Sequence, residues 1–268
     1  MALELNVDGR RVFAATGGKP FDAELPVVVF LHGAGMNRTV WALPARYFAN
    51  HGYAVMALDL PAHGNSDGPP LPSIGELADW LVRVLDAAGV VSATLVGHSM
   101  GTLPLLETSA RHPERVDRIV LLGMSLPMAV SGGLLDCARV DDPAAYDMVN
   151  LWGHSKRAQL GGGRAAGTWV TGAGLRLLER SGPGVLYNDM NSCNEYQTGL
   201  EAARSITCPA VLILGDSDRM TPARNTDALL QALPKGRRIV LKGCGHMMLG
   251  EQPDETLDAL IDATRRTP

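Results

Sequence analysis

Six short apolar segments without alternation of apolar and polar residues constrain the fold of this chain more than any other feature. A strand without alternation is buried on both faces, as in a parallel sheet covered by helices. Helical patterns lie between these segments, and a repeated order of strand and helix predicts an α/β protein with a mostly parallel, twisted sheet. The predicted strands are residues 27–31, 54–58, 94–96, 118–122, 211–214 and 238–241.

Local signals mark the flanking elements. Ser73 and Glu76 form a capping box, apolar residues continue the helix, and Gly89 ends it. Thr221-Pro222 predicts the start of a helix through Leu233. Asp8-Gly9 predicts the turn of an antiparallel hairpin. The hairpin strands are predicted at 3–7 and 11–15, which brings the sheet to about eight strands, and further helices at 102–111 and 254–266.

Residues 125–205 interrupt the alternation of strand and helix, because they contain helical stretches at 144–152 and 174–180 and little β-like alternation. Glycine-rich turns punctuate this segment. We therefore predict an α/β core from residues 1–124 and 206–268, and a helical insertion at 125–205.

Composition excludes several classes of function. The net charge is -4 and the 24 basic residues are scattered, so we expect neither nucleic acid nor anionic lipid as a partner. No apolar stretch reaches the roughly 18 residues of a membrane span and no leader is evident, which predicts a soluble, cytoplasmic protein. The four cysteines form no C-x-x-C pair, so we expect no metal site, no disulfide framework and no cofactor.

The pentapeptide Gly97-His98-Ser99-Met100-Gly101 follows one predicted strand and precedes a helix. Such a turn needs glycine two positions on either side of the serine, because the tightly bent backbone leaves no room for side chains. Ser99 is therefore a candidate nucleophile. At its ordinary pKa a serine needs a base, and the candidate is His246, which follows Gly243 and Gly245 near the C-terminus.

Four motifs together resemble the α/β-hydrolase superfamily from Leu25 to roughly Arg266. They are the serine turn, residues 30–35 (FLHGAG), residues 58–66 (LDLPAHGNS), and the pair 215–218 (GDSD) with 243–246 (GCGH). The order serine, aspartate, histidine is that of the superfamily. The resemblance implies a serine hydrolase whose insertion is a helical cap over the active site.

The resemblance also implies the remaining roles in the site. It favours Asp218 as the acid that orients His246, with Asp216 as the alternative. Backbone amides of Met100 and Ala34 would form the oxyanion hole, with Gly35 as the next candidate. Asp59 is expected to take no direct part in the reaction, because an aspartate at a strand end commonly fixes a loop. His63, His98 and His112 are set aside as bases on position, and His98 is expected to point away from the nucleophile.

An apolar substrate pocket follows as a hypothesis from the composition of the insertion and of the predicted site. The predicted substrate-binding residues are Gly33, Gly35, Met124, Leu126, Trp152, Trp169 and Met247. The polar run 188–194 is expected either to hydrogen-bond substrate or to form a solvated turn.

These features predict a hydrolase of small or medium, largely apolar carboxylic esters, acting as a monomer or homodimer through an acyl-enzyme. One alternative is a C–C bond hydrolase of vinylogous diketones. That reaction needs cationic anchors for a carboxylate, for which Arg157, Arg164, Arg176 and Arg180 are candidates. A non-catalytic ligand receptor on the same fold is the other alternative.

Overall fold

The computed structural model describes residues 1–164 and 167–265. Its centre is one eight-stranded sheet with the strand order β1-β2-β4-β3-β5-β6-β7-β8. The hairpin strands β1 and β2 pair antiparallel, β2 pairs antiparallel with β4, and all other neighbours are parallel. The strands are β1 (Ala2–Val7), β2 (Arg10–Ala15), β3 (Val27–Leu31), β4 (Ala54–Leu58), β5 (Ala93–His98), β6 (Val116–Leu122), β7 (Ala210–Gly215) and β8 (Gly236–Leu241).

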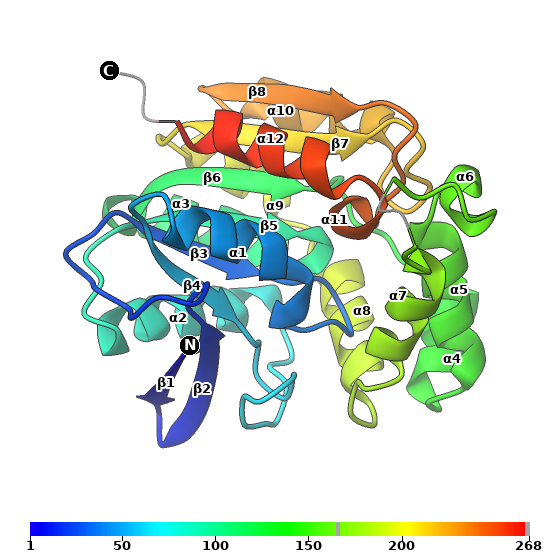
Figure 1. Ribbon diagram of the computed structural model, residues 1–268, viewed down its shortest axis with the longest axis horizontal. Helices are drawn as coiled ribbons and strands as arrows, with labels where there is room; N and C mark the ends of the chain where they lie inside the picture. The colour runs from blue at the N-terminus through cyan, green and yellow to red at the C-terminus, as the bar shows by residue number, and fades with distance from the viewer. Residues whose placement is uncertain (165–166, 266–268) are drawn as a thin grey trace.

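Helices cover both faces of the sheet, which confirms the predicted α/β-hydrolase architecture (Figure 1). One apolar core joins the sheet to α1 (Ala42–Ala49), α11 (Met248–Glu251) and α12 (Pro253–Thr264). The other joins it to α2 (Ile74–Ala87), α3 (Leu103–Arg111), α9 (Gly199–Ser205) and α10 (Asp227–Ala232). Short 3-10 turns are η1 (Arg38–Trp41), η2 (Ser99–Thr102), η3 (Pro113–Arg115) and η4 (Ala223–Thr226).

The helical insertion follows β6 and lies beyond the carboxyl ends of the parallel strands (Figure 1). Its helices are α4 (Gly132–Arg139), α5 (Pro143–Gly153), α6 (Lys156–Gln159), α7 (Val170–Leu178), α8 (Val185–Glu195) and α9. Of these, α9 packs against α3 and α10 of the core rather than against the other helices of the insertion.

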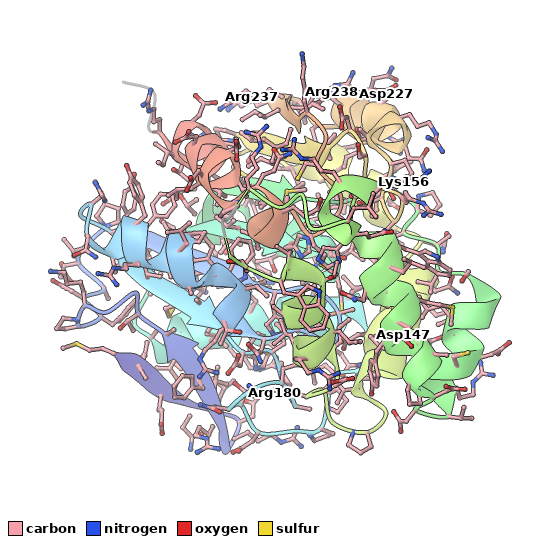
Figure 2. The ribbon with its side chains drawn as sticks, turned by 45° about the vertical axis from the view of Figure 1, so that its right-hand side comes forward. Asp147, Lys156, Arg180, Asp227, Arg237 and Arg238 are labelled. Atoms are coloured by element: carbon pink, nitrogen blue, oxygen red, sulfur yellow. The ribbon has the colours of Figure 1, made fainter. Side chains whose placement is uncertain are left out.

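The burial of the strand residues matches their apolar sequence. Every residue of β3, β4 and β7 is buried, as expected for strands without alternation between two layers of helices. The edge strand β8 is more exposed, and its Arg238 pairs with Asp227 of α10 at 2.5 Å (Figure 2). Ser73 caps α2 by accepting the Glu76 amide, as the capping box predicts.

The predicted helix at 221–233 begins later than expected. The Thr221 amide and hydroxyl both donate to Asp218, so they belong to a loop, and α10 starts only at Asp227 after η4. The predicted C-terminal helix ends at Thr264, and residue 266 is outside the described residues. In residues 1–164 and 167–265, no helix has the length and apolar character needed to cross a bilayer.

Candidate active site

Ser99 lies at the carboxyl end of β5, where the chain turns into η2 and α3. Its backbone φ is +53°, in the left-handed region that side chains rarely adopt. A Cβ on Gly97 would lie 2.4 Å from the Gly101 carbonyl oxygen, and one on Gly101 would lie 2.5 Å from that of His32. Glycine on both sides of Ser99 is therefore a steric requirement of this turn.

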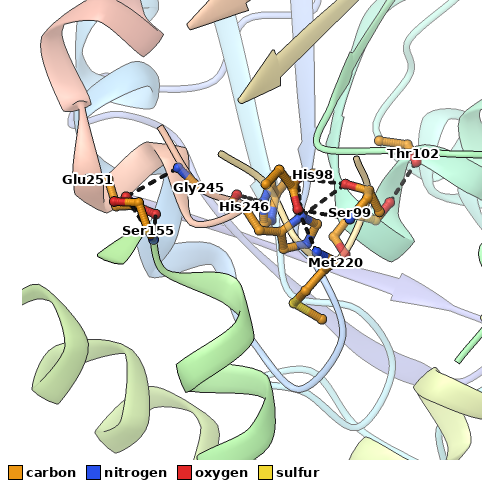
Figure 3. A network of polar contacts seen from close by, with 10 residues as sticks. His98, Ser99, Thr102, Ser155, Met220, Gly245, His246 and Glu251 are labelled. Atoms are coloured by element: carbon orange, nitrogen blue, oxygen red, sulfur yellow. Dashed lines mark hydrogen bonds and ion pairs between the residues drawn. The ribbon is translucent and has the colours of Figure 1, made fainter. Parts of the chain in front are cut away.

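His246 and Asp218 come from the loops after β8 and β7, and the structure brings them together. The His246 Nδ1 atom lies 2.8 Å from Asp218 Oδ2, and both side chains are buried. Figure 3 shows His246 beside Ser99, and both residues line the same cavity. The three residues that the sequence predicts as a catalytic triad thus converge at the carboxyl edge of the sheet.

Several donors hold the Asp218 carboxylate. The amides of Met220 and Thr221 each donate to Oδ1 at 2.8 Å, and the Thr221 hydroxyl donates to Oδ2 at 2.7 Å. Burial alone would raise the pKa of Asp218, but His246 and these donors lower it well below its ordinary value. Asp218 therefore stays ionised beside His246, which is what an orienting acid requires.

The alternative acid, Asp216, has a different position. Its carboxylate accepts the Gly243 amide and the Ser217 hydroxyl in an exposed loop. It contacts no ring nitrogen of His246 in the described residues. Asp216 therefore joins the two loops that carry Asp218 and His246.

The loop after β3, residues 33–36, is here called the oxyanion loop. Ala34 lines the cavity with Ser99 and His246, and its amide makes no hydrogen bond within the described residues. The Gly35 amide donates to Asp189 of α8 at 2.9 Å, so it is unavailable to an oxyanion. Met100 is buried in η2 immediately after Ser99. Among the predicted donors, Ala34 and Met100 remain candidates, whereas Gly35 does not.

His32 and Asp59 stabilise the loops around this site. The Nδ1 atom of His32 donates to the Gly33 carbonyl at 2.9 Å, and its Nε2 accepts the Leu60 amide at 3.1 Å. Burial, followed by the nearby His63, lowers the pKa of His32, which keeps the ring neutral for this pair of bonds. The buried Asp59 carboxylate accepts the amides of Arg38 and Asn65, both at 2.8 Å. Both residues thus fix loops, as the sequence predicts for Asp59.

The cavity beside Ser99 and His246 measures about 210 Å³, and its lining is largely apolar. Residues of the helical insertion form much of its wall, and the exposed residue Arg219 also lines it. Its lining comprises Ala34, Ser99, Met128, Ala129, Val130, Ser131, Leu134, Trp152, Met190, Cys193, Arg219, Met220, Thr221 and His246.

A larger cavity of about 520 Å³ lies between α7, η1, α1 and α11. It is lined by His98 and Met247, the chain neighbours of Ser99 and His246, but by neither Ser99 nor His246. The smaller cavity is therefore the candidate active site, because the reactive side chains open into it. His98 is oriented differently, since its Nε2 donates to the His246 carbonyl at 2.9 Å.

The predicted substrate-binding residues do not all line the smaller cavity. Trp152 lines the smaller cavity and Met247 the larger one. Gly33 lies close to Ser99, since a Cβ there would be 3.1 Å from the Ser99 Cβ. Met124 and Leu126 belong to the apolar core and line neither cavity in the described chain.

Trp169 requires a correction. Its side chain is 74% exposed, its ring lies against Gly172 of the adjoining helix α7, and it lines neither of the two cavities described above. A large aromatic residue in an insertion suggests a pocket wall from sequence, but here the ring packs on the helix that follows it. We therefore do not place Trp169 in the substrate site.

Comparison with known proteins agrees with this architecture. A model of the alpha/beta hydrolase family matches residues 28–259, which include every residue of the triad. The chain belongs to this family. The alpha/beta-hydrolase fold supports many different reactions, so the substrate is determined by the site and not by the fold.

Curated relatives of this alpha/beta hydrolase match most of its length. It is 29% identical over 256 residues to the 2-hydroxy-6-oxononadienedioate/2-hydroxy-6-oxononatrienedioate hydrolase of Paraburkholderia phymatum, covering 88% of this chain and 85% of the relative. It is 24% identical over 248 residues to the (E)-2-((N-methylformamido)methylene)succinate hydrolase of Acinetobacter baylyi, covering 90% and 91%.

Among solved structures, the fold is similar to that of the enol-lactonase from Burkholderia xenovorans LB400. The TM-score is 0.83 at 20% identity, and the alignment covers 97% of this chain and 98% of the other.

The sequence does not predict a role in the site of this alpha/beta hydrolase for three residues that lie near it: Thr221, Arg219 and Asp189. Arg219 and Thr221 lie one and three residues after the predicted acid, so proximity in sequence was the available signal. Asp189 lies in the polar run 188–194, which is neither a solvated turn nor substrate-facing throughout. The run forms much of α8, where the Asn188 side chain donates to the Leu71 carbonyl and the Ser192 hydroxyl donates to the Pro72 carbonyl.

The cysteines Cys137, Cys193, Cys208 and Cys244 are free thiols. Burial raises the pKa of Cys193, which lines the smaller cavity, and of Cys244 near His246. Both therefore remain protonated. Within the described ranges, no group of three or more His, Cys, Asp or Glu side chains is arranged to hold a metal ion.

Proposed function

We propose that this alpha/beta hydrolase is a serine hydrolase of small or medium, largely apolar carboxylic esters. One observation carries the proposal: Ser99 and His246 open into one mostly apolar cavity, and the His246 ring is bonded to the ionised Asp218. The Asp218 carboxylate accepts a hydrogen bond from the Nδ1–H group of His246, which leaves Nε2 unprotonated and able to act as a base.

The reaction has two halves. Ser99 Oγ attacks the ester carbonyl as His246 takes its proton, and the amides of Met100 and Ala34 stabilise the oxyanion. His246 then protonates the departing alcohol, which leaves an acyl group on Ser99. Water, deprotonated by the same histidine, attacks the acyl carbonyl, and collapse of the second tetrahedral intermediate releases the acid and restores Ser99.

The helical insertion acts as a cap in this proposal. Met128, Leu134, Trp152, Met190 and Cys193 all belong to it and line the wall of the cavity around Ser99. Closure by apolar side chains excludes water around the reacting groups and favours an apolar acyl or alcohol portion.

A C–C bond hydrolase is the second candidate, and Arg219 favours it. A cationic residue that lines the cavity could bind the carboxylate of a dienoate, and the Paraburkholderia relative is named as a hydrolase of such a dicarboxylate. The arginines of the insertion do not support this candidate. Arg157 bonds the Gly162 carbonyl, Arg164 pairs with Glu255, and Arg176 and Arg180 line the larger cavity.

Covalent labelling with turnover tests the proposal. We expect a fluorophosphonate to add one phosphonyl group to the protein, as read by intact mass, and p-nitrophenyl esters to be hydrolysed. Ser99→Ala removes the adduct and lowers turnover by at least about a thousandfold. Ser131→Ala is the matched control, because Ser131 lines the same cavity but is an N-cap of α4.

The outcomes separate the candidates. Turnover of esters with labelling at Ser99 supports the ester hydrolase. Labelling with turnover of a dienoate diketone alone supports the C–C hydrolase, and that activity would then fall in Arg219→Ala. Absence of both labelling and turnover contradicts both enzymatic candidates and favours a ligand receptor.

A further inference from the structure

A buried ion pair links the helical insertion to the oxyanion loop. Asp189 of α8 accepts the Gly35 amide through Oδ2 at 2.9 Å, and the same oxygen lies 2.9 Å from His63 Nε2. The side chains of His63 and Asp189 are 2% and 3% exposed. A single carboxylate oxygen from the insertion thus contacts two loops of the core.

The His63 ring is held on both sides. Its Nδ1 lies 3.0 Å from the Pro61 carbonyl and its Nε2 faces Asp189. Both nitrogens face oxygen acceptors, so the ring satisfies both only as an imidazolium. Burial lowers the pKa of His63, but Asp189 raises it, and the net direction is upward.

The insertion also packs closely against Gly35 itself. Gly35 has φ +64°, and a Cβ there would lie 3.0 Å from Leu186 Cδ1 of α8 and 3.2 Å from Leu178 Cδ2 of α7. The side chains of two insertion helices therefore pack directly over the oxyanion loop.

We propose that Asp189 is a positioning residue which couples docking of α8 to the geometry of the oxyanion hole. The inference rests on the proposed function, in which the Ala34 amide binds the oxyanion. By accepting the Gly35 amide, Asp189 fixes the peptide plane between Ala34 and Gly35 and leaves the preceding amide, that of Ala34, free for the substrate. Undocking of α8 releases that plane, so a complete oxyanion hole forms only under a closed insertion.

Another contact of α8 supplies a matched control. Asn188 Nδ2 donates to the Leu71 carbonyl at 2.8 Å and so also anchors α8 to the core, but within the described residues its side chain makes no hydrogen bond to the oxyanion loop. Asp147 on α5 is a second control, because it is exposed on the outer surface of the insertion (Figure 2). Asn188→Ala tests loss of any anchor, and Asp147→Asn tests loss of a charge.

Hydrogen–deuterium exchange tests the coupling without any substrate. In Asp189→Asn and Asp189→Ala, peptides that cover residues 33–36 should exchange at least about tenfold faster than in the wild type, with Asn the milder change because its amide oxygen still accepts Gly35. Asn188→Ala and Asp147→Asn should leave these peptides unchanged. Unchanged exchange in a folded Asp189 variant, or an equal effect of Asn188→Ala, overturns the proposal.

Steady-state kinetics separates positioning from simple stabilisation. At a temperature where all variants are folded, Asp189→Ala should lower kcat about ten- to a hundredfold with KM within about threefold of the wild type, and Asp189→Asn should recover part of the loss. A kcat equal to that of the wild type means that Asp189 has only a structural role. Were the wild type itself inactive on esters, the proposed function would fail, and the exchange result would still decide the coupling.

Discussion

Ser99 combines a strained backbone with a reactive side chain. Its φ of +53° costs of order 1 kcal/mol for a residue with a Cβ, and the surrounding structure holds it there. The Thr102 hydroxyl donates to the Ser99 carbonyl at 2.6 Å and so secures the far side of the turn. This backbone conformation places Ser99 at the cavity that His246 also lines.

Thr221 tests how Asp218 is held. Thr221→Val removes the donor 2.7 Å from Asp218 Oδ2 but keeps the backbone donors and the shape of the side chain. A hydrogen bond to a charged group contributes roughly 1.5–3 kcal/mol, so we expect the free energy of unfolding to fall by about that amount. We also expect kcat on esters to fall about tenfold, since a loosened carboxylate orients His246 less well. Urea unfolding and steady-state kinetics at pH 7.5 measure both.

Thr221→Ser is the control for that substitution, because it keeps the hydroxyl and removes only a methyl group. It should recover most of the kcat lost in Thr221→Val. Equal kcat in the wild type and Thr221→Val would mean that the two amides alone hold the carboxylate.

Single residues differ in how far the sequence reveals them. Ser99 and His246 are marked by adjacent glycines, which the local backbone requires, so the sequence identifies them as candidates. Asp189 carries no such mark, because its partners Gly35 and His63 lie 154 and 126 residues earlier in the chain. Its function depends on a tertiary contact between the insertion and the core, and neighbouring residues in sequence do not encode it.

At the scale of elements, the nucleophile turn is packed against the end of β3. A Cβ on Gly101 would meet the carbonyl oxygens of His32 and Leu31 at 2.5 and 2.6 Å, and these are backbone atoms that cannot rotate away. We expect Gly101→Ala to lower the free energy of unfolding by roughly 1–3 kcal/mol or more, as for overpacked cores, and to reduce kcat by displacing Ser99. Urea denaturation and ester turnover measure these effects.

Gly133 in α4 provides the comparison, since a Cβ there meets nothing within 4 Å. Gly133→Ala should be neutral or should stabilise the protein by about 0.5–1 kcal/mol, because alanine loses less backbone entropy in a helix. Equal stability of Gly101→Ala and Gly133→Ala would contradict the steric argument.

Elements with strong local signals are those that the sequence predicts well. The buried strands and the capped helix α2 follow from apolar runs and from Ser73 with Glu76. The start of α10 does not, because Thr221 and Pro222 have the composition of a helix start, yet the Thr221 amide and hydroxyl bond Asp218 instead. Site chemistry there overrides local preference.

For the whole molecule, buried histidines make stability depend on pH. Five of the seven histidines are buried, and they lie around the site, at the contact of core and insertion. Burial lowers the pKa of His32 and His154, and burial with the adjacent His246 ring lowers that of His98 to about 3. Only His63, paired with Asp189, has a raised pKa among the buried histidines whose pKa shifts.

The direction of the pH effect follows from these shifts. A histidine with a lowered pKa binds its proton more readily when unfolded, so its contribution to stability is lost as pH falls below about 6.5. His63 acts in the opposite sense, since its contribution is complete below about 6.5 and is lost as pH rises through its folded pKa. Asp218, with its lowered pKa, contributes until the pH falls below the ordinary range of aspartate, and so adds to the loss only in strong acid.

We therefore expect the free energy of unfolding to fall between pH 7.5 and pH 5, with His98 alone accounting for about 2 kcal/mol, given its folded pKa of about 3 and a reference value near 6.5. Urea unfolding across this range measures the slope. His98→Asn should remove that part of the slope, whereas His51→Asn, at an exposed position, controls for the loss of a histidine. A slope that is the same in His98→Asn as in the wild type would show that the buried ring does not resist protonation. Stability at acid pH would then have to be set by groups other than the His98 imidazole.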